Sequence, residues 1–489
     1  MNSVDSFTFT LSKLNNQILR HTAQLKSNYQ NFINVKQFSM KSLVSNKGMA
    51  LIAFALLAII SIAAALWRTN YPTLPDGKSY DATMVGNIAW MLVATSFVLL
   101  MTPGLAFFYG GMVSRRSIIS TMVQSFIALG SITILWYVVG FSLAFGDDVG
   151  GMGLIGDPRT FFMFNNVGTA PHPSLGSGLP LVLFAAFQLK FAIITPALIT
   201  GSFAERVRFW GYLVFIHIWL LLIYCPLAHM AWHPQGLLAV KGALDFAGGT
   251  VVHISAGCAA LAGALVLGRR KSAGNLPVNI PYVILGTGLL WFGWFGFNGG
   301  SALAANGIAI KAFFNTNLAA GTAAVSWIML DAARGKKPSA LGACIGAVVG
   351  LVAITPACGY VDFGPSLFIG FAAAIISNLA VSMFHSTTID DTLDVFPCHG
   401  IGGITGMILT AVFATEGGTG LIKGSWTLLG VHGFALAIVV PFAFVGSWLI
   451  YKLTDIITPL RVDESAETAG LDISQHDESF LIQQSSLAN

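Results

Sequence analysis

The sequence predicts an all-α polytopic membrane protein. Of its 489 residues, 55% are hydrophobic and only 9% are charged, and the mean hydropathy is +0.74. A water-soluble domain carries about 25% charged residues, so this chain has too few to cover a surface that faces water. Uncharged apolar runs also recur along the chain. Their length is close to the roughly 20 residues that a helix needs to span a bilayer core.

The amino-terminal part has the pattern of a leader. Residues 1–47 form a polar extension, and residues 48–67 are an uncharged apolar run that ends in three alanines at 63–65. A charged flank, an apolar stretch and a small-residue end describe a signal peptide. Because 47 leading residues are too many for one, we expect translation to start at Met40 and cleavage to follow Ala65. An uncleaved extra helix is the alternative.

From Ala82 onward the apolar runs predict eleven transmembrane helices, which make up a domain of residues 82–454. The expected ranges are 82–111, 118–145, 179–200, 209–231, 246–268, 280–302, 308–331, 340–358, 365–385, 400–415 and 427–454. Lys and Arg cluster after every second range, for example at 115–116, 206–208 and 269–271. The positive-inside rule makes that side cytoplasmic, so the mature N-terminus is expected outside and the C-terminus inside.

The spans also resemble one another in two sets of five. The first ends in Phe-Tyr-Gly-Gly (108–111) and the sixth in Phe-Asn-Gly-Gly (297–300), while the fifth and the tenth each carry a histidine beside glycines. Five spans followed by five similar spans must point in opposite directions. The sequence therefore predicts a five-plus-five inverted repeat with the substrate path between the halves.

His253 and His399, the histidines of the fifth and tenth spans, are the strongest indication of function. Ionisable groups inside a bilayer are costly and usually mark a substrate or ion path. The alternative is two histidines that pack and donate to backbone carbonyls. One histidine at the corresponding place of each half favours a pore. Since histidine titrates near neutrality, the pair is suited to relay a proton.

Aromatic residues gather near the outer halves of several spans. Phe187 and Phe191 share one helix face through their i,i+4 spacing, while Trp232 follows the fourth span and the sixth carries Trp294 and Phe297, close to Ser301. An aromatic ring attracts a desolvated cation by roughly 0.5–2 kcal/mol. The alternative is a belt of Trp residues at the membrane interface.

Asp245, which precedes the fifth span, is placed to cap that helix. A carboxylate there binds free N–H groups and stays anionic near the positive end of the helix dipole. The functional consequence is a fixed negative charge near the outer mouth, which favours cations.

Other chemistries have little support in the sequence. The five cysteines form no CxxC pair, and no basic block is interleaved with aromatics, so we expect no cofactor, no metal site and no nucleic-acid partner. A membrane enzyme that uses the two histidines as acid/base groups or metal ligands would lack a third type of ligand.

Longer motifs resemble the ammonium transporter family (Amt/MEP/Rh), of the bacterial Amt type, over residues 84–480. The matching stretches are residues 103–111, 204–206, 243–253, 294–298 and 394–400. The resemblance implies a homotrimer of eleven-helix protomers in the bacterial cytoplasmic (inner) membrane, each protomer with its own pore for ammonium or ammonia.

The resemblance also implies roles for single residues. It assigns ammonium binding to Phe191, Trp232 and Ser301, a gate to Phe187, Phe191 and Phe297, the pore to His253, His399 and Trp294, and recruitment to Asp245. The implied mechanism begins with ammonium at the aromatic site. Deprotonation follows, and ammonia crosses the apolar section while the proton either follows along the histidines or stays outside.

Two further features bear on function. Residues 455–489 resemble the family's cytoplasmic regulatory tail, which implies a PII-type regulatory protein as partner; a solvated end is the alternative. An ammonium sensor of the same fold, signalling through this tail, is the alternative function. Lys190 departs from the family's pattern. It lies about 60° from the Phe187 direction on a helix, so we expect it to snorkel away from the pore.

Overall fold

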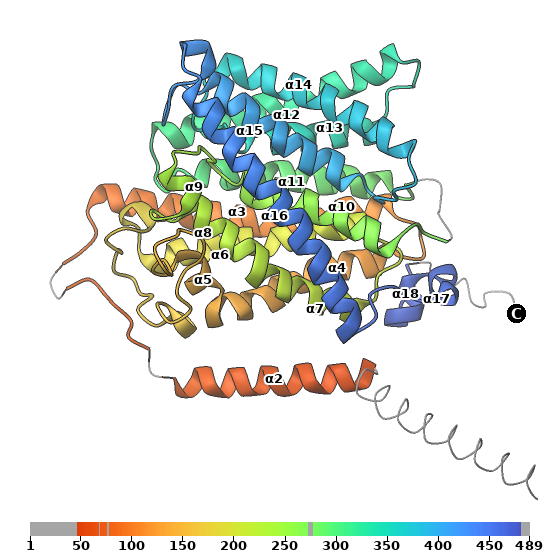
Figure 1. Ribbon diagram of the computed structural model, residues 1–489, viewed down its shortest axis with the longest axis horizontal. Coiled ribbons are helices and arrows are strands. Elements are labelled where there is room, and N and C mark those ends of the chain that lie inside the picture. Colours follow the sequence, from red (N-terminus) through yellow and green to blue (C-terminus); the bar gives the residue numbers. More distant parts are fainter. Residues whose placement is uncertain (1–45, 68, 76–77, 272–276, 481–489) are drawn as a thin grey trace, which may run out of the picture. The chain divides into compact units, whose positions relative to one another are not determined.

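The computed structural model describes residues 46–67, 69–75, 78–271 and 277–480, and these residues are mostly helical (Figure 1). No β-strand is formed among them, which confirms the predicted all-α fold. The chain divides into two units, residues 1–67 and 68–489. The expected start at Met40 lies outside the described residues.

The first unit contributes one described helix, α2 (Asn46–Leu66). It matches the apolar run expected at 48–67, and its length and composition are sufficient to cross a membrane. Within the described ranges, ten helices meet this condition, α2 included. The protein is therefore a multi-pass helical membrane protein.

The second unit contains the remaining helices. In chain order they are α3 (Ala82–Met112), α4 (Ile118–Leu135), η1 (Trp136–Gly140), α5 (Phe141–Phe145), η2 (Phe162–Phe164), η3 (Gly176–Gly178), α6 (Leu181–Ile199), η4 (Thr200–Phe203), α7 (Phe209–Trp219), η5 (Leu220–Tyr224), α8 (Cys225–Trp232), α9 (Leu237–Val240), η6 (Gly249–Ile254), α10 (Ser255–Leu267), α11 (Ile280–Gly300), α12 (Gly307–Ala333), α13 (Ala340–Ile354), α14 (Phe363–His385), η7 (Phe396–Ile401), α15 (Gly402–Phe413), η8 (Leu421–Lys423), α16 (Thr427–Ile457), α17 (Glu464–Ala469) and α18 (Leu471–His476).

Each of the eleven expected ranges falls on one of these helices or on a continuous run of them. Two of the ranges, on α12 and α13, are not among the ten helices that meet the membrane-crossing condition, and α13 has only 15 residues. Helix packing joins distant parts of the chain: α3 lies along α11, α10 along α16, and α12 along both α13 and α14.

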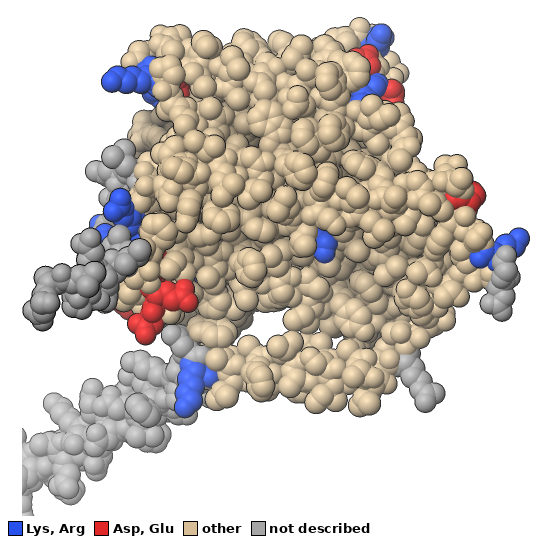
Figure 2. Space-filling view, turned by 180° about the vertical axis from the view of Figure 1, so that it is seen from behind, with Lys and Arg blue, Asp and Glu red and all other residues tan. Residues whose placement is uncertain are grey.

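The loops after alternate helical segments meet at one end of this unit. Arg270, after α10, forms ion pairs with Glu205 after η4 (2.8 Å) and with Asp390 after α14 (2.9 Å). Glu205 also accepts from the backbone N–H of Ser114, after α3, at 2.5 Å. We call this the basic end. The face visible in Figure 2 is almost free of charged side chains, which gather toward its left and right edges.

The described part of the tail folds onto the basic end. Asp472 in α18 accepts from the backbone N–H groups of Ile119 (3.1 Å) and Ser120 (2.7 Å), at the start of α4. Glu467 in α17 pairs with Arg461 at 2.8 Å. Residues 464–476 are therefore helical and docked.

Candidate functional site

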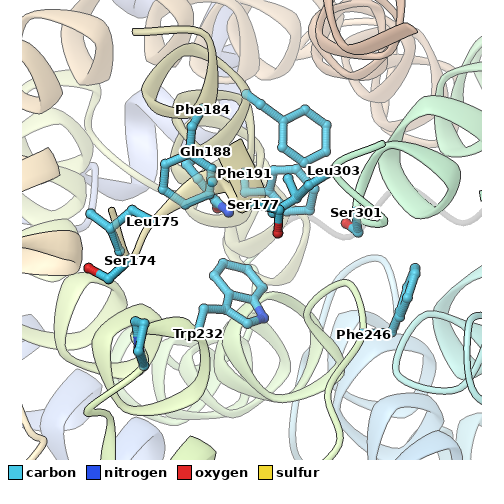
Figure 3. Close-up of a pocket in the computed structure, with 13 residues that line it drawn as sticks. Ser174, Leu175, Ser177, Phe184, Gln188, Phe191, Trp232, Phe246, Ser301 and Leu303 are labelled. Carbon is cyan, nitrogen blue, oxygen red and sulfur yellow. The ribbon is translucent and has the colours of Figure 1, made fainter. Parts of the chain in front are cut away.

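A cavity of about 270 Å³ lies between the loop that precedes α6 and the ends of α8 and α11 (Figure 3). Its lining brings together the three residues expected to bind substrate, Phe191, Trp232 and Ser301. The full lining is Ser174, Leu175, Gly176, Ser177, Phe184, Phe187, Gln188, Phe191, Trp232, Pro234, Phe246, Ser301 and Leu303. We call it the outer cavity. Aromatic faces make up much of its wall.

Polar acceptors interrupt this aromatic wall. The hydroxyl of Ser301 donates to the carbonyl of Phe297 at 2.8 Å, so its lone pairs stay available. The Oε1 atom of Gln188 is buried and has no hydrogen-bond partner in the described structure. Sequence reasoning missed Gln188 and Phe246. A signal existed for Gln188, because it is an amide within an apolar span, one helical turn before Phe191.

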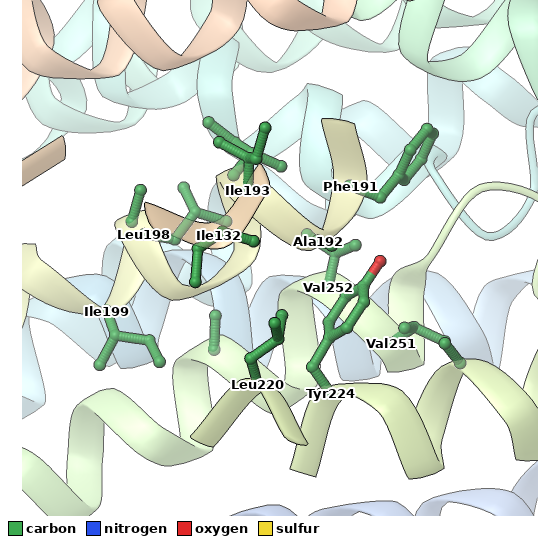
Figure 4. Close-up of a cluster of buried hydrophobic side chains, with 14 of the residues drawn as sticks. Ile132, Phe191, Ala192, Ile193, Leu198, Ile199, Leu220, Tyr224, Val251 and Val252 are labelled. Carbon is green, nitrogen blue, oxygen red and sulfur yellow. The ribbon is translucent and has the colours of Figure 1, made fainter. Parts of the chain in front are cut away.

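Packing behind the cavity wall fixes the position of Phe191. Helix α6 is buried over most of its length. Figure 4 shows its residues 191–193 and 198–199 within a cluster that includes Ile132 of α4, Leu220 and Tyr224 of η5, and Val251 and Val252 of η6. A close-packed interior resists small shifts, so the ring at the floor of the outer cavity has a defined place.

A column of rings leads inward from the outer cavity. The centroids of Trp232 and Phe191 are 5.7 Å apart, those of Phe191 and Phe297 4.2 Å, those of Phe297 and His253 6.0 Å, and those of His253 and His399 5.4 Å. Phe187 packs beside Phe191 at 4.9 Å. Phe191 and Phe297 are at most 1% exposed. Their rings therefore lie against each other between the outer cavity and His253.

The two histidines are in direct contact. Their Nδ1 atoms are 3.3 Å apart, a hydrogen bond in which the tautomers decide which ring donates and which accepts. The Nε2 atom of His253 is buried without a partner. Trp294 stacks on His253 with centroids 5.3 Å apart, and its indole N–H donates to the Thr355 hydroxyl at 2.9 Å.

Local backbone features bring the histidines together. His253 and His399 lie in the π-helical segments η6 and η7, a type of helix that is rare and frequent at functional sites. Gly257 lies one turn after His253, against Gly400. A Cβ atom at position 257 would be 2.3 Å from the Gly400 nitrogen. Only glycine therefore permits this approach.

Asp245 caps the segment that carries His253. Its Oδ1 atom accepts from the backbone N–H groups of Gly248 (2.9 Å) and Gly249 (2.6 Å). Its Oδ2 atom accepts from the backbone N–H of Thr250 at 2.7 Å and from the Thr250 hydroxyl. The Trp232 indole donates to the Asp245 carbonyl at 3.2 Å. Asp245 does not line the outer cavity, and its contact with the cavity wall is made through Trp232.

A second cavity, which we call the inner cavity, lies on the other side of the histidine pair. It measures about 10 Å³ and is lined by Phe108, Tyr109, Met112, Ile345, Val348, Leu393, Cys398 and His399. The ring column thus connects two cavities. Among the described residues, no group of three His, Cys, Asp or Glu side chains is placed to hold a metal ion.

Lys190 is partly buried and does not line the outer cavity. For the ammonium uptake that the family resemblance implies, we expect Lys190→Met to change the apparent affinity less than about twofold, because Lys190 does not line the outer cavity. Uptake measured across a range of ammonium concentrations checks this. A large gain in affinity would show that the lysine charge opposes cation capture.

Known proteins are similar to this chain over most of its length. The model of the Ammonium Transporter Family matches residues 89–480. An ammonium transporter of Aquifex aeolicus is 45% identical over 400 residues, which cover 80% of this chain and 92% of that protein. The crystal structure of Mep2 from Saccharomyces cerevisiae is similar with a TM-score of 0.73 at 34% identity, covering 78% of this chain and 88% of that chain. The structure of a sensor Amt protein is similar with a TM-score of 0.75 at 30% identity, covering 81% of this chain and 99% of that chain.

Proposed function

Because the chain belongs to the ammonium transporter family, we propose that it moves ammonium or ammonia across the membrane along the ring column. The single observation that carries this proposal is the unbroken series of rings from the outer cavity to the inner cavity, with a histidine pair at its inner end.

Capture occurs in the outer cavity. A cation over the faces of Trp232 and Phe191 is stabilised by about 0.5–2 kcal/mol, more when it is desolvated. The Ser301 hydroxyl is an acceptor for N–H groups, which a potassium ion lacks, and the Gln188 side chain lines the same cavity. The negative field of Asp245 favours any cation, so discrimination rests on the hydrogen bonds.

Passage requires the loss of a proton. The rings of Phe191 and Phe297 offer no hydrogen bonds, and a buried ion without them costs several kcal/mol. Ammonium avoids this cost by giving up a proton, and neutral ammonia crosses past His253, Trp294 and His399. Potassium has no proton to lose and is excluded by the same barrier.

The membrane arrangement is part of the proposal. Eleven crossing helices form a five-plus-five inverted repeat, and the basic end faces the cytoplasm of a bacterial inner membrane, with the mature N-terminus outside and the C-terminus inside. The contacts among the loops of the basic end support the alternation. Residues 82–454 form the transport domain, and residues 48–67 are a cleaved signal peptide or an extra helix. Three copies of the chain assemble into a trimer. The docked tail is the surface to which a PII-type regulatory protein binds.

The test uses purified protein in proteoliposomes, with ammonium uptake and current on a solid-supported membrane measured together. We expect ammonium-dependent uptake that potassium does not reproduce. His253→Ala is expected to remove any ammonium-dependent current, because it breaks the Nδ1–Nδ1 contact. Equal currents with ammonium and potassium would contradict the proposal.

A sensor of the same fold is the second candidate, because a sensor Amt protein is among the similar structures. It predicts ammonium binding to the intact protein without flux. Binding without uptake, measured in the same preparation, would favour it over transport.

A further inference from the structure

Asp245 and Asp391 occupy matching places before the two histidines. Each precedes its histidine by eight residues, since 253 − 245 and 399 − 391 are both 8. Each accepts a backbone N–H at the start of the π-helical segment that carries the histidine: Gly249 for Asp245 and Phe396 for Asp391. The two carboxylates therefore hold equivalent segments.

Their hydrogen bonding differs. Both carboxylate oxygens of Asp245 are occupied. In Asp391, Oδ2 accepts from the Phe396 N–H at 2.7 Å, whereas Oδ1 is buried and has no hydrogen-bond partner. Asp391 is 7% exposed. A buried carboxylate oxygen without a donor is costly, so it needs an explanation beyond capping.

The charged groups around Asp391 are engaged elsewhere. Asp394 binds His385 at 2.9 Å, and Asp390 pairs with Arg270 at 2.9 Å. The Arg206 guanidinium donates to the Thr392 hydroxyl (2.6 Å) and to the Asp390 carbonyl (2.6 Å). Among the described residues, no Lys, Arg or His forms an ion pair with Asp391. Burial raises the pKa of Asp391 to about 7 and the charge of Asp394 adds to the rise, while the backbone N–H groups of Phe396 and Val395 and the charge of Arg206 oppose it.

Asp391 is close along the chain to residues that line the inner cavity. Leu393 lines it together with Tyr109, Cys398 and His399, and the Asp391 carboxylate accepts from the Phe396 N–H of the segment that carries Cys398 and His399. The Tyr109 hydroxyl is occupied, because it donates to the Leu198 carbonyl at 2.8 Å. A cavity of about 10 Å³ has room for roughly one water molecule. A water molecule in this cavity would lie against His399, on the side of the histidine pair from which the proton must leave.

Resting on the proposed function, we infer that Asp391 accepts the proton that leaves the histidine pair at the basic end. An N–H bond of ammonium breaks in the outer cavity, and an N–H bond forms on His253. The shared Nδ1 proton then moves to His399, an N–H bond of His399 breaks, and an O–H bond forms at Asp391 Oδ1. That proton passes to water at the basic end. One proton and one ammonia leave for each ammonium that enters, so charge and atoms balance.

Asp391→Asn is the test, with Asp394→Asn as its matched control. Asparagine keeps an oxygen for the Phe396 N–H but cannot take up the proton. We expect at least about a tenfold loss of ammonium-dependent current. Ammonia still crosses, because its proton then returns to the outer water, and ammonia that enters without its proton makes the liposome interior alkaline. Asp394→Asn removes the same charge three residues away, at a positive φ of 56° that asparagine adopts readily, and is expected to keep the current.

The pH profile gives a second readout that a merely structural role would not move. Below a pH of about 7 at the basic end, Asp391 is protonated and cannot accept, so the current of the wild type falls there. Asp391→Asn loses this dependence. In Asp394→Asn the midpoint moves to lower pH, because a neighbouring negative charge is gone.

Several outcomes would overturn the inference. They are wild-type current in Asp391→Asn, or an equal loss of current and ammonia flux in protein that remains folded. Ammonia flux without current in the wild type would also overturn it while leaving the proposed function intact. Absence of both fluxes in the wild type would instead contradict the proposed function itself.

Discussion

Replacing Gly257 by alanine is expected to lower ammonium transport about a hundredfold, because a small displacement of reacting groups has effects of that size. The added Cβ would lie 2.3 Å from the Gly400 nitrogen and 2.4 Å from its Cα. Both are backbone atoms of the segment that carries His399, so they cannot turn aside as a flexible side chain does. The segment η7 must shift, and the 3.3 Å contact between the two Nδ1 atoms is lost. Uptake into proteoliposomes measures the effect.

Gly288→Ala on α11 is the matched control. A Cβ at this position meets nothing within 4 Å. Alanine is favoured over glycine in a helix by up to about 1 kcal/mol, so the control is expected to be slightly more stable and to transport normally. Overpacking at Gly257 costs about 1–3 kcal/mol, which thermal unfolding in detergent detects. Normal transport by folded Gly257→Ala would show that the histidine contact is dispensable.

The helices were predictable from the sequence, because a chain in a bilayer must satisfy its backbone hydrogen bonds within apolar helical runs. The boundaries were less accurate. The tenth span was expected at 400–415, whereas η7 begins at Phe396. The reason is Asp391, which caps the Phe396 N–H from outside the apolar run. A hydropathy pattern cannot predict where a helix begins when its first N–H group is bound by a side chain outside the apolar run.

The candidate site was predictable in its residues but not in its geometry. The positions of His253 and His399 in two similar segments suggested a common pore. Their contact depends on the close approach of Gly257 to Gly400. These two glycines are 143 positions apart in the sequence, and no local sequence pattern predicts that they meet in the fold. The π-helical form of η6 and η7 was likewise not expected, since a π-helix has no distinct apolar period.

Gln188 illustrates why part of the site was missed. In the sequence, a single amide side chain within an apolar span is most simply interpreted as a packing residue or as a hydrogen-bonding residue between helices. Its importance appears only when residues 174–177, Trp232 and Ser301 come from distant segments to form a cavity with it. A free Oε1 atom is a property of that assembly and not of α6 alone.

Polar groups occur at the two ends of the column of rings, and apolar rings occupy the part between them. Hydrogen-bond acceptors for a cation occur in the outer cavity, and nitrogens that exchange protons occur at His253 and His399. The closely packed Phe191 and Phe297 rings between them offer neither. In the proposed mechanism a charged substrate is stabilised at the outer end, so its capture there depends on the aromatic faces.

Trp232→Leu is accordingly expected to raise the apparent KM for ammonium by up to about thirtyfold, since a desolvated cation–π contact contributes about 2 kcal/mol. Leucine fills space but lacks the electron-rich face, and it also frees the Asp245 carbonyl that the indole now binds at 3.2 Å. Trp232→Phe separates these two effects, because phenylalanine restores a ring without the N–H. We expect it to recover most of the affinity.

Uptake at graded ammonium concentrations measures the KM of each variant. Trp426→Leu controls for loss of a tryptophan as such, because Trp426 is 71% exposed and does not line the outer cavity. Equal KM values for the Leu and Phe variants of Trp232 would mean that the indole N–H, through the Asp245 carbonyl, positions the site. In that case the ring face would contribute little, and capture would rest on Gln188 and Ser301.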